Sequence, residues 1–182
     1  IGWFDGSLTV GTVDGGFSWT QGAWRQVGRP HHVVAVTELG VVFRDGSSWP
    51  DDGFRGLTVE ALAWRGELVR FTNDGQMHTV DRVVELPGPV ADASVVNGEI
   101  RIALHSAAAI WNGQSLRVLP IPATAAGPWW GTAEGAIVTD RAERIGGVPG
   151  LIHAIQSVDG IPVVSTDNGV WSVGHQTKAW SE

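Results

Sequence analysis

Glu60, Asp92 and His153 are the side chains whose types and placement could support chemistry. Each lies directly before an alanine in a short run of alternating apolar residues, so the three share a register if the runs are equivalent strands. Two carboxylates and an imidazole that converge could hold a cation or a small polar ligand. No asparagine lies in register with them, and no nucleophile or oxyanion donor accompanies them. We expect a ligand-binding site there without a metal; solvated or packing positions are the ordinary alternative.

Tryptophan is the second residue type that stands out, with ten copies in 182 residues. A set of six follows predicted turns or lies in outer strands: Trp19, Trp49, Trp111, Trp171, Trp24 and Trp180. We expect these rings to fill the space between neighbouring repeat units, and the alternative is a lectin-like ring of exposed indoles that stack on sugars. Trp129 and Trp130 are the better candidates for exposure, because adjacent strand residues face opposite sides and cannot both fill one core.

Other motifs of catalysis or metal binding are missing from the sequence. The chain has no cysteine, no glycine-rich phosphate loop, no nucleophile elbow and no His-x-x-x-His spacing. His31 and His32 are adjacent, which is poor geometry for joint metal binding on a strand, and we expect a structural or solvent role. Asp51 and Asp52 are expected to solubilise a loop. The sequence therefore predicts no metal, no cofactor and no enzymatic activity.

The elements that must position these residues are indicated by a repeated six-residue phrase, Thr/Ser-x-x-Gly/Ala-x-apolar. Its six copies begin at Thr12, Thr37, Thr72, Ser106, Thr132 and Thr166. Repetition at about 30 residues marks a repeat architecture. Glycine or Asp-Gly between alternating apolar runs predicts tight hairpin turns, and we expect positive φ at Asp14-Gly15, Asp74-Gly75 and Asn168-Gly169.

The third unit shows the repeat most plainly. Four strand-like runs follow one another over residues 60–64, 67–72, 76–80 and 82–86, separated by turn residues and ended by a Pro-Gly-Pro break. Helical periodicity is almost absent. Four-stranded antiparallel units repeated along a chain are typical of β-propeller blades.

At this point the chain resembles bacterial β-propeller repeats, a group that includes two-component-regulator propellers and sialidase-like repeats. The resemblance rests on the segments 8–30 and 163–180, and on the phrase TVDGGFSW over residues 12–19, which matches the Asp box of sialidases. In that family the box is a structural turn on the rim of a blade. The sialidase nucleophile is a tyrosine, and this chain has none, so sialidase chemistry is not expected.

We therefore predict an all-β, compact, six-bladed β-propeller-like repeat domain of short antiparallel four-stranded units, spanning residues 1–182 and open to being part of a larger protein. Two registers are possible for the units, one that follows the Thr phrase and one that follows turns at Asp14, Asp45, Asp74, Ala107, Asp140 and Asp167. Closure of a ring would bring Ile1 and Glu182 within about one blade of each other.

Bulk composition limits the partners. The net charge is −7 and the basic residues are scattered singly, so we expect no nucleic-acid partner. No apolar run reaches the roughly 18 residues of a membrane helix, so no membrane is expected. The arginine-rich, tyrosine-free composition resembles that of GC-rich bacteria, and the compartment stays open.

The functional prediction is a non-catalytic binding platform that recognises a protein partner through loops on one propeller face. Its ligand-binding candidates are Trp129, Trp130, Glu60, Asp92 and His153. A carbohydrate-binding lectin is the alternative, with a glycan as partner. A hydrolase or lactonase with a site in the channel, built on Glu60, Asp92 and His153, is the third class.

Overall fold

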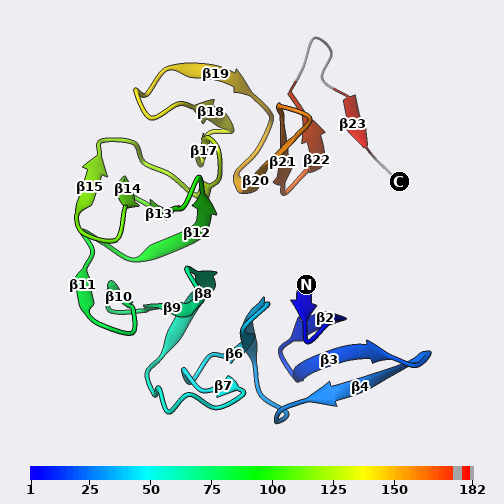
Figure 1. Ribbon diagram of the computed structural model, residues 1–182. Coiled ribbons are helices and arrows are strands. Elements are labelled where there is room, and N and C mark those ends of the chain that lie inside the picture. Colours follow the sequence, from blue (N-terminus) through cyan, green and yellow to red (C-terminus); the bar gives the residue numbers. More distant parts are fainter. Residues whose placement is uncertain (174–177, 181–182) are drawn as a thin grey trace. The chain divides into compact units, whose positions relative to one another are not determined.

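The computed structural model describes residues 1–173 and 178–180, and of the last three only the strand that they form. The chain divides into two compact units, residues 1–86 and 87–182. Each unit is built from antiparallel sheets that follow one another along the sequence (Figure 1). The expectation of one domain over residues 1–182 stays a prediction.

Unit 1 contains three sheets. Sheet 1 consists of β1 (Gly2–Phe4), β2 (Ser7–Thr12), β3 (Gly15–Thr20) and β4 (Ala23–Val27). Sheet 2 consists of β5 (Val33–Thr37), β6 (Gly40–Phe43) and β7 (Ser48–Trp49). Sheet 3 consists of β8 (Thr58–Trp64), β9 (Glu67–Thr72), β10 (Gln76–His78) and β11 (Val83–Glu85).

Unit 2 also contains three sheets. Sheet 4 consists of β12 (Val90–Val96), β13 (Glu99–Leu104), β14 (Ala107–Trp111) and β15 (Leu116–Leu119). Sheet 5 consists of β16 (Ala125–Ala126), β17 (Trp130–Gly131), β18 (Ala136–Val138) and β19 (Arg144–Gly147). Sheet 6 consists of β20 (Ile152–Val158), β21 (Ile161–Thr166), β22 (Gly169–Ser172) and β23 (Lys178–Trp180).

These six sheets confirm the all-β assignment and the sixfold repeat. Every sheet pairs its strands in sequence order, as propeller blades do. Sheet 2 departs from the expected four strands and has three. The residues after β7 form a loop instead, because Pro50 has no N–H to donate and the carboxylates of Asp51 and Asp52 bind the amides of Gly53 and Phe54 at 3.0 and 3.2 Å.

In sheets 1 and 6 the repeated threonine closes the turn between the second and third strands. The Thr12 hydroxyl donates to the Gly15 carbonyl at 3.0 Å and accepts from the Asp14 amide at 3.1 Å. Thr166 makes the same pair of bonds in sheet 6, at 3.3 and 3.1 Å. A short hydroxyl side chain thus satisfies backbone groups that the tight turn leaves without ladder partners, which explains why the phrase repeats.

Neither sequence register holds through all six sheets. In sheet 2 the Thr37 turn joins the first and second strands, and Asp45 marks the turn between β6 and β7. In sheet 4 the residue that matches Thr12 is Leu104, and Ser106 lies within the turn. In sheet 5 the Thr phrase is in place, whereas Asp140 lies between the third and fourth strands. Similar turn residues therefore join different pairs of strands in different sheets, so neither register assigns the turns correctly in all six sheets.

The three predicted hairpin tips are confirmed. Gly15, Gly75 and Gly169 have φ of 143°, 83° and 117°. At φ 83° a β-branched side chain is strained, so we expect Gly75→Val to lower the free energy of unfolding by roughly 1 kcal/mol or more. Urea denaturation measures this change. Gly88→Ala is the matched control, because a Cβ there would meet only the Ser106 hydroxyl at 3.7 Å; equal losses in both variants would contradict the prediction.

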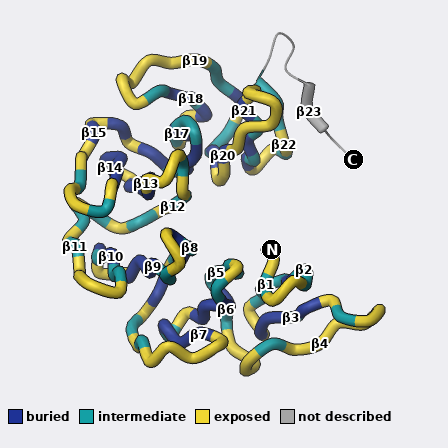
Figure 2. The backbone as a smooth tube through the Cα atoms, in the orientation of Figure 1, coloured by how far each residue is buried: buried dark blue, intermediate teal, exposed yellow. Residues whose placement is uncertain are grey.

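In both units, a glycine of one sheet lies against a bulky side chain of the next sheet. A Cβ at Gly11 of sheet 1 would lie 2.5 Å from a methyl group of Val33 in sheet 2, and one at Gly131 of sheet 5 would lie 2.5 Å from a methyl group of Ile152 in sheet 6. Glycine at these positions lets the sheets approach closely. Figure 2 shows the buried residues concentrated in inner strands such as β6, β13 and β14, while β4 and β11 are largely exposed.

Across the described residues, the structure contains no helix with the length and apolar character needed to cross a lipid bilayer. Glu182 lies outside the described residues, so the expected proximity of Ile1 and Glu182 stays a prediction. The side chain of Trp180 also lies outside the described part of the chain.

Candidate binding site

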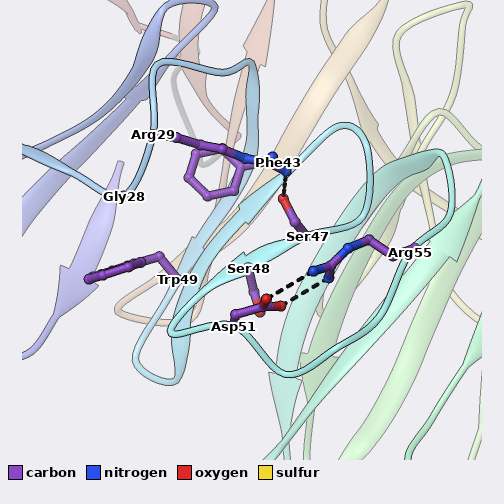
Figure 3. A pocket seen from close by; sticks show the side chains of 8 residues that line it. All are labelled: Gly28, Arg29, Phe43, Ser47, Ser48, Trp49, Asp51 and Arg55. Carbon is purple, nitrogen blue, oxygen red and sulfur yellow. Dashed lines mark hydrogen bonds and ion pairs between the residues drawn. The ribbon is translucent and has the colours of Figure 1, made fainter.

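A pocket of about 300 Å³ lies beside β7 in unit 1, where sheet 2 has no fourth strand. It is enclosed by the connection that follows β4, by sheet 2 and by the loop over residues 50–57 (Figure 3). Its lining residues are Gly28, Arg29, Phe43, Ser47, Ser48, Trp49, Asp51 and Arg55. Two aromatic rings, two guanidinium groups, a carboxylate and two hydroxyls therefore surround one small volume.

Asp45 organises the first wall of this pocket. Its carboxylate accepts bonds from the Ser47 amide and hydroxyl at 3.1 and 2.7 Å, and it forms an ion pair with Arg29. Arg29 also contacts the Ser47 hydroxyl, and its guanidinium lies 5.8 Å from the centre of the Phe43 ring. Partial burial acts to raise the pKa of Asp45, but the Ser47 hydrogen bonds and the charges of Arg29 and His31 outweigh burial, so the pKa is lowered. Asp45 is therefore ionised at neutral pH and holds Arg29 in place.

Arg55 and Asp51 form the opposite wall. Both guanidinium Nη atoms of Arg55 bind the Asp51 carboxylate at 2.9 Å, and the Gly53 amide donates to the same carboxylate at 3.0 Å. These hydrogen bonds hold the pKa of Asp51 well below its usual range, with those from Arg55 first in importance. The two-point contact fixes the orientation of the guanidinium plane toward the pocket (Figure 3).

The same loop is anchored to sheet 3 on its other side. Asp52 binds Arg70 at 2.7 Å, and the guanidinium of Arg70 lies 4.8 Å from the centre of the Phe54 ring. Phe54 in turn meets His78 edge to face at 5.1 Å. The Arg70 side chain is 4% exposed, and the Asp52 carboxylate compensates its buried charge. Asp51 and Asp52, which were expected only to solubilise the loop, hold it in one conformation.

Such a pocket is suited to binding. Trp49 is 51% exposed and offers an apolar surface, while Arg29, Arg55 and the two serines offer polar contacts. Because the charged groups are already held by partners within the protein, a ligand would meet a site that needs little reorganisation.

The predicted constellation of Glu60, Asp92 and His153 does not share one register. Glu60 and Asp92 occupy equivalent positions, each one residue after a β-bulge in the first strand of its sheet. His153 is itself the bulged residue of β20, and Ala154 takes the place that matches Asp92. The expectation of a common register was therefore wrong for His153, because all three strands carry the same bulge and the alanine after His153 corresponds to Asp92 itself.

Each of these side chains has a local structural contact. The Glu60 carboxylate accepts a bond from the Ala61 amide at 2.8 Å, and the His153 ring lies 2.5 Å from the Asp167 carboxylate. The Asp92 carboxylate accepts the Ala126 amide at 2.8 Å and so links sheet 4 to sheet 5. Burial raises the pKa of Asp92 to about 6, although the amides of Ala126 and Ala93 act to lower it. A ligand-binding role for these residues stays a prediction.

Trp130 was expected to be a candidate for exposure, and this expectation was wrong. The side chain is fully buried between sheets 4 and 5. Its indole N–H donates to Asp140 at 2.9 Å, and the guanidinium of Arg101 lies 4.3 Å above its ring. Arg101 also binds Asp140 and donates to the Pro128 carbonyl at 2.8 Å. Among the described residues, Trp130 is the largest fully buried side chain, and it forms part of the core.

Trp129 lies in the bend before β17 and faces the opposite side of sheet 5 from Trp130. It is half-buried, packs against the core between sheets 5 and 6, and borders a second hollow of about 350 Å³. That hollow is also lined by Pro128, Thr139, Asp140, Arg141 and Glu143. Trp129 therefore keeps its predicted role as a candidate ligand contact.

Apart from Trp180, the tryptophans that were expected to fill the space between repeat units divide into two groups. Trp111 is buried and Trp171 packs against the core of unit 2, as expected for rings between sheets. Trp19, Trp24 and Trp49 are 46%, 49% and 51% exposed, so the packing role does not extend to them. A ring nitrogen of His31 lies 3.5 Å from the Asp45 carboxylate, in agreement with a structural role for that histidine.

The residues that build the pocket were not predicted as a site. Arg29, Phe43 and Arg55 come from three different segments, and only the fold brings them together. A sequence signal was present in residues 44–56, RDGSSWPDDGFRG, which are rich in charged, aromatic and turn residues. This segment lies where sheet 2 lacks a fourth strand.

No model of a known protein family matches the sequence, and no curated protein matches it. Several solved structures are similar. The WD40 β-propeller domain of Doa1 shares 13% identity, with a TM-score of 0.65 over 96% of this chain and 79% of that one. BBS1N, solved in complex with ARL6DN, shares 14% identity, with a TM-score of 0.65 over 96% and 77%. The extracellular domain of BT4673 from B. thetaiotaomicron shares 11% identity, with a TM-score of 0.71 over 96% of this chain and 32% of that one.

Together with the six sheets, these similarities define the class: the protein has a β-propeller-type fold. At this level of identity the similarity establishes the fold alone. The narrower resemblance to two-component-regulator and sialidase-like repeats stays a prediction.

Proposed function

We propose that this protein is a non-catalytic binding platform that recognises a protein partner through the pocket beside β7. The observation that carries this proposal is the amphipathic pocket itself, in which an exposed tryptophan adjoins two arginines held by ion pairs. Tryptophan and arginine dominate the binding energy of protein interfaces, and groups held in place lose little entropy on binding. The complex of BBS1N with ARL6DN supports the proposal, because a structure of similar fold was solved bound to another protein.

The proposal that the protein is not an enzyme rests on the ionisation and the contacts of two carboxylates in and beside the pocket. Asp51, the carboxylate that lines the pocket, has its pKa held below the usual range by Arg55, so it is a poor proton acceptor at neutral pH. Asp45 is similarly occupied by Arg29 and Ser47. We propose that the protein shows no hydrolase or lactonase turnover, with or without added Ca²⁺.

The pocket is tested with peptides selected from a phage-displayed library of random peptides on the wild-type protein. We expect Trp49→Ala to weaken the selected peptides at least about tenfold, measured as Kd by biolayer interferometry, because it removes the exposed aromatic surface. Trp19→Ala is the matched control, since Trp19 is similarly exposed but does not line the pocket. Peptides that bind both variants as tightly as the wild type would overturn the proposed site.

A lectin function is the second candidate, and one observation favours it. The exposed ring of Trp49 and the paired Asp51 and Arg55 border one pocket, which combines a stacking surface with polar groups that could bind sugar hydroxyls. A glycan array decides between the two: glycan binding that Trp49→Ala abolishes, with no peptide selected, would favour the lectin.

A further inference from the structure

The pocket beside β7 contains arginine N–H groups that the protein does not use. In the described part of the chain, Arg29 donates hydrogen bonds only from Nη2, to the Asp45 carboxylate and to the Ser47 hydroxyl. Its Nε–H and both Nη1 hydrogens have no acceptor there. The Arg29 side chain is 52% exposed, so these donors are open to a ligand.

Arg55 is in a similar state on the opposite wall of the pocket (Figure 3). Its Nη1 donates to Asp51 and to the Phe54 carbonyl at 2.9 and 2.6 Å, and its Nη2 donates to Asp51 at 2.9 Å. One Nη2 hydrogen and the Nε–H have no acceptor among the described residues, and the side chain is 56% exposed. Arg29 and Arg55 together leave open as many N–H groups as they use.

The two hydroxyl groups of the pocket add no donors for a ligand. The Ser47 hydroxyl donates to Asp45 at 2.7 Å, and the Ser48 hydroxyl donates to the Pro50 carbonyl at 2.7 Å. Each hydroxyl has a single hydrogen, which is therefore already engaged within the protein. The donors that a ligand meets are those of the two arginines, so the ligand has to supply hydrogen-bond acceptors.

The charge and size of the pocket indicate which acceptor fits. Two guanidinium groups and the Asp51 carboxylate line it, which gives the lining a formal charge of +1. One carboxylate balances that charge, whereas a phosphate group carries about −1.5 to −2. Trp49 and Phe43 add an apolar surface beside the arginines. A volume of about 300 Å³ is at the lower end of the range for ligand pockets and suits a short segment of a larger partner.

Building on the proposed function, we propose that the protein partner inserts an aspartate or glutamate, next to a large apolar side chain, into this pocket. The carboxylate accepts the open N–H groups of Arg29 and Arg55, and the apolar side chain lies on Trp49. Because Asp45 and Asp51 already hold the two arginines, the carboxylate meets guanidinium groups that are fixed before binding.

The probe is a peptide that was selected on the wild-type protein and that Trp49→Ala weakens, synthesised with both ends blocked so that its termini carry no charge. We expect such peptides to contain an aspartate or glutamate beside an aromatic or large aliphatic residue. Replacing that acidic residue in the peptide by its amide should weaken binding at least about tenfold, because hydrogen bonds to a charged acceptor are the stronger ones. This substitution leaves the protein unchanged, so the test does not depend on the folding of a variant.

Arginine variants identify the groups that meet the carboxylate. Arg29→Lys and Arg55→Lys keep the charge but lose the planar fork of donors. Each should weaken the acidic peptide at least about fivefold and the amide peptide clearly less, because only the acidic peptide loses a charge-assisted contact. Arg44→Lys is the matched control, since Arg44 is exposed in the same segment but does not line the pocket. Circular dichroism confirms that the variants are folded.

The outcomes distinguish the chemistry of the partner segment from the proposed site. Peptides that Trp49→Ala weakens, but that bind equally well as acid and as amide, would leave the proposed site in place and overturn the acidic segment. Equal losses of both peptides in the two arginine variants would do the same. Tighter binding of a phosphoserine peptide would overturn the carboxylate in favour of phosphate. If no selected peptide depends on Trp49, the proposed function fails, and the acidic segment fails with it.

Discussion

Replacing Trp130 with alanine is expected to lower the free energy of unfolding by about 3 to 5 kcal/mol. The substitution removes a fully buried indole and opens a cavity between sheets 4 and 5. It also deprives Arg101 of the ring beneath its guanidinium and Asp140 of the indole N–H. Urea denaturation followed by far-ultraviolet circular dichroism measures the loss without relying on tryptophan fluorescence.

Trp130→Phe separates packing from hydrogen bonding in this prediction. Phenylalanine keeps an aromatic ring under Arg101 but donates no hydrogen bond to Asp140, so its loss should be clearly smaller than that of alanine. A loss below about 1 kcal/mol for Trp130→Ala would mean that the ring is not essential to this core.

Replacing Asp92 with asparagine is expected to stabilise the protein at neutral pH. The carboxyl is largely removed from water, and burial raises its pKa from 3.8 to about 6, so the charged form is disfavoured in the folded state. Asparagine keeps a carbonyl oxygen that can accept the Ala126 amide bond. A shift of this size corresponds to roughly 2 to 3 kcal/mol at pH 7.5, which is the gain that we expect.

The stability difference between Asp92→Asn and the wild type should depend on pH in a defined direction. The folded-state pKa of Asp92 is raised, so its contribution to stability is fully present below about pH 3.8 and is lost as the pH rises through about 6. The difference between Asp92→Asn and the wild type should therefore be close to zero near pH 3.5 and should grow up to pH 7. Thermal unfolding across this range tests the curve; a difference that does not change with pH would contradict it.

The sequence was sufficient to predict the repeat because each repeat contains its own turn chemistry. A threonine hydroxyl that closes a hairpin, and a glycine with positive φ, are local requirements that can be read from a few residues. Each register was wrong where a similar turn joins a different pair of strands, as at Thr37 and Asp140. The residues of a turn do not indicate which two strands of a sheet the turn connects.

The pocket was harder to predict because it forms where one of the repeated sheets lacks a strand. The pocket lies where sheet 2 has no fourth strand, and its residues come from segments joined only by packing. Trp130 shows the opposite error: its neighbour in sequence suggested exposure, but the buried Arg101 and the exposed Asp140 that contact its ring lie 29 residues before and 10 residues after it. Such long-range ion pairs have no periodic signature.

The cores shared between neighbouring sheets link the stability of each sheet to that of the next. Loss of sheet 1 would uncover Val33 and Phe43 of sheet 2, and loss of sheet 6 would uncover Ile137 and Val148 of sheet 5. Either loss leaves apolar area in contact with water, which costs free energy and favours aggregation. Sheets 4, 5 and 6, which share two cores, are therefore expected to unfold together as one cooperative segment.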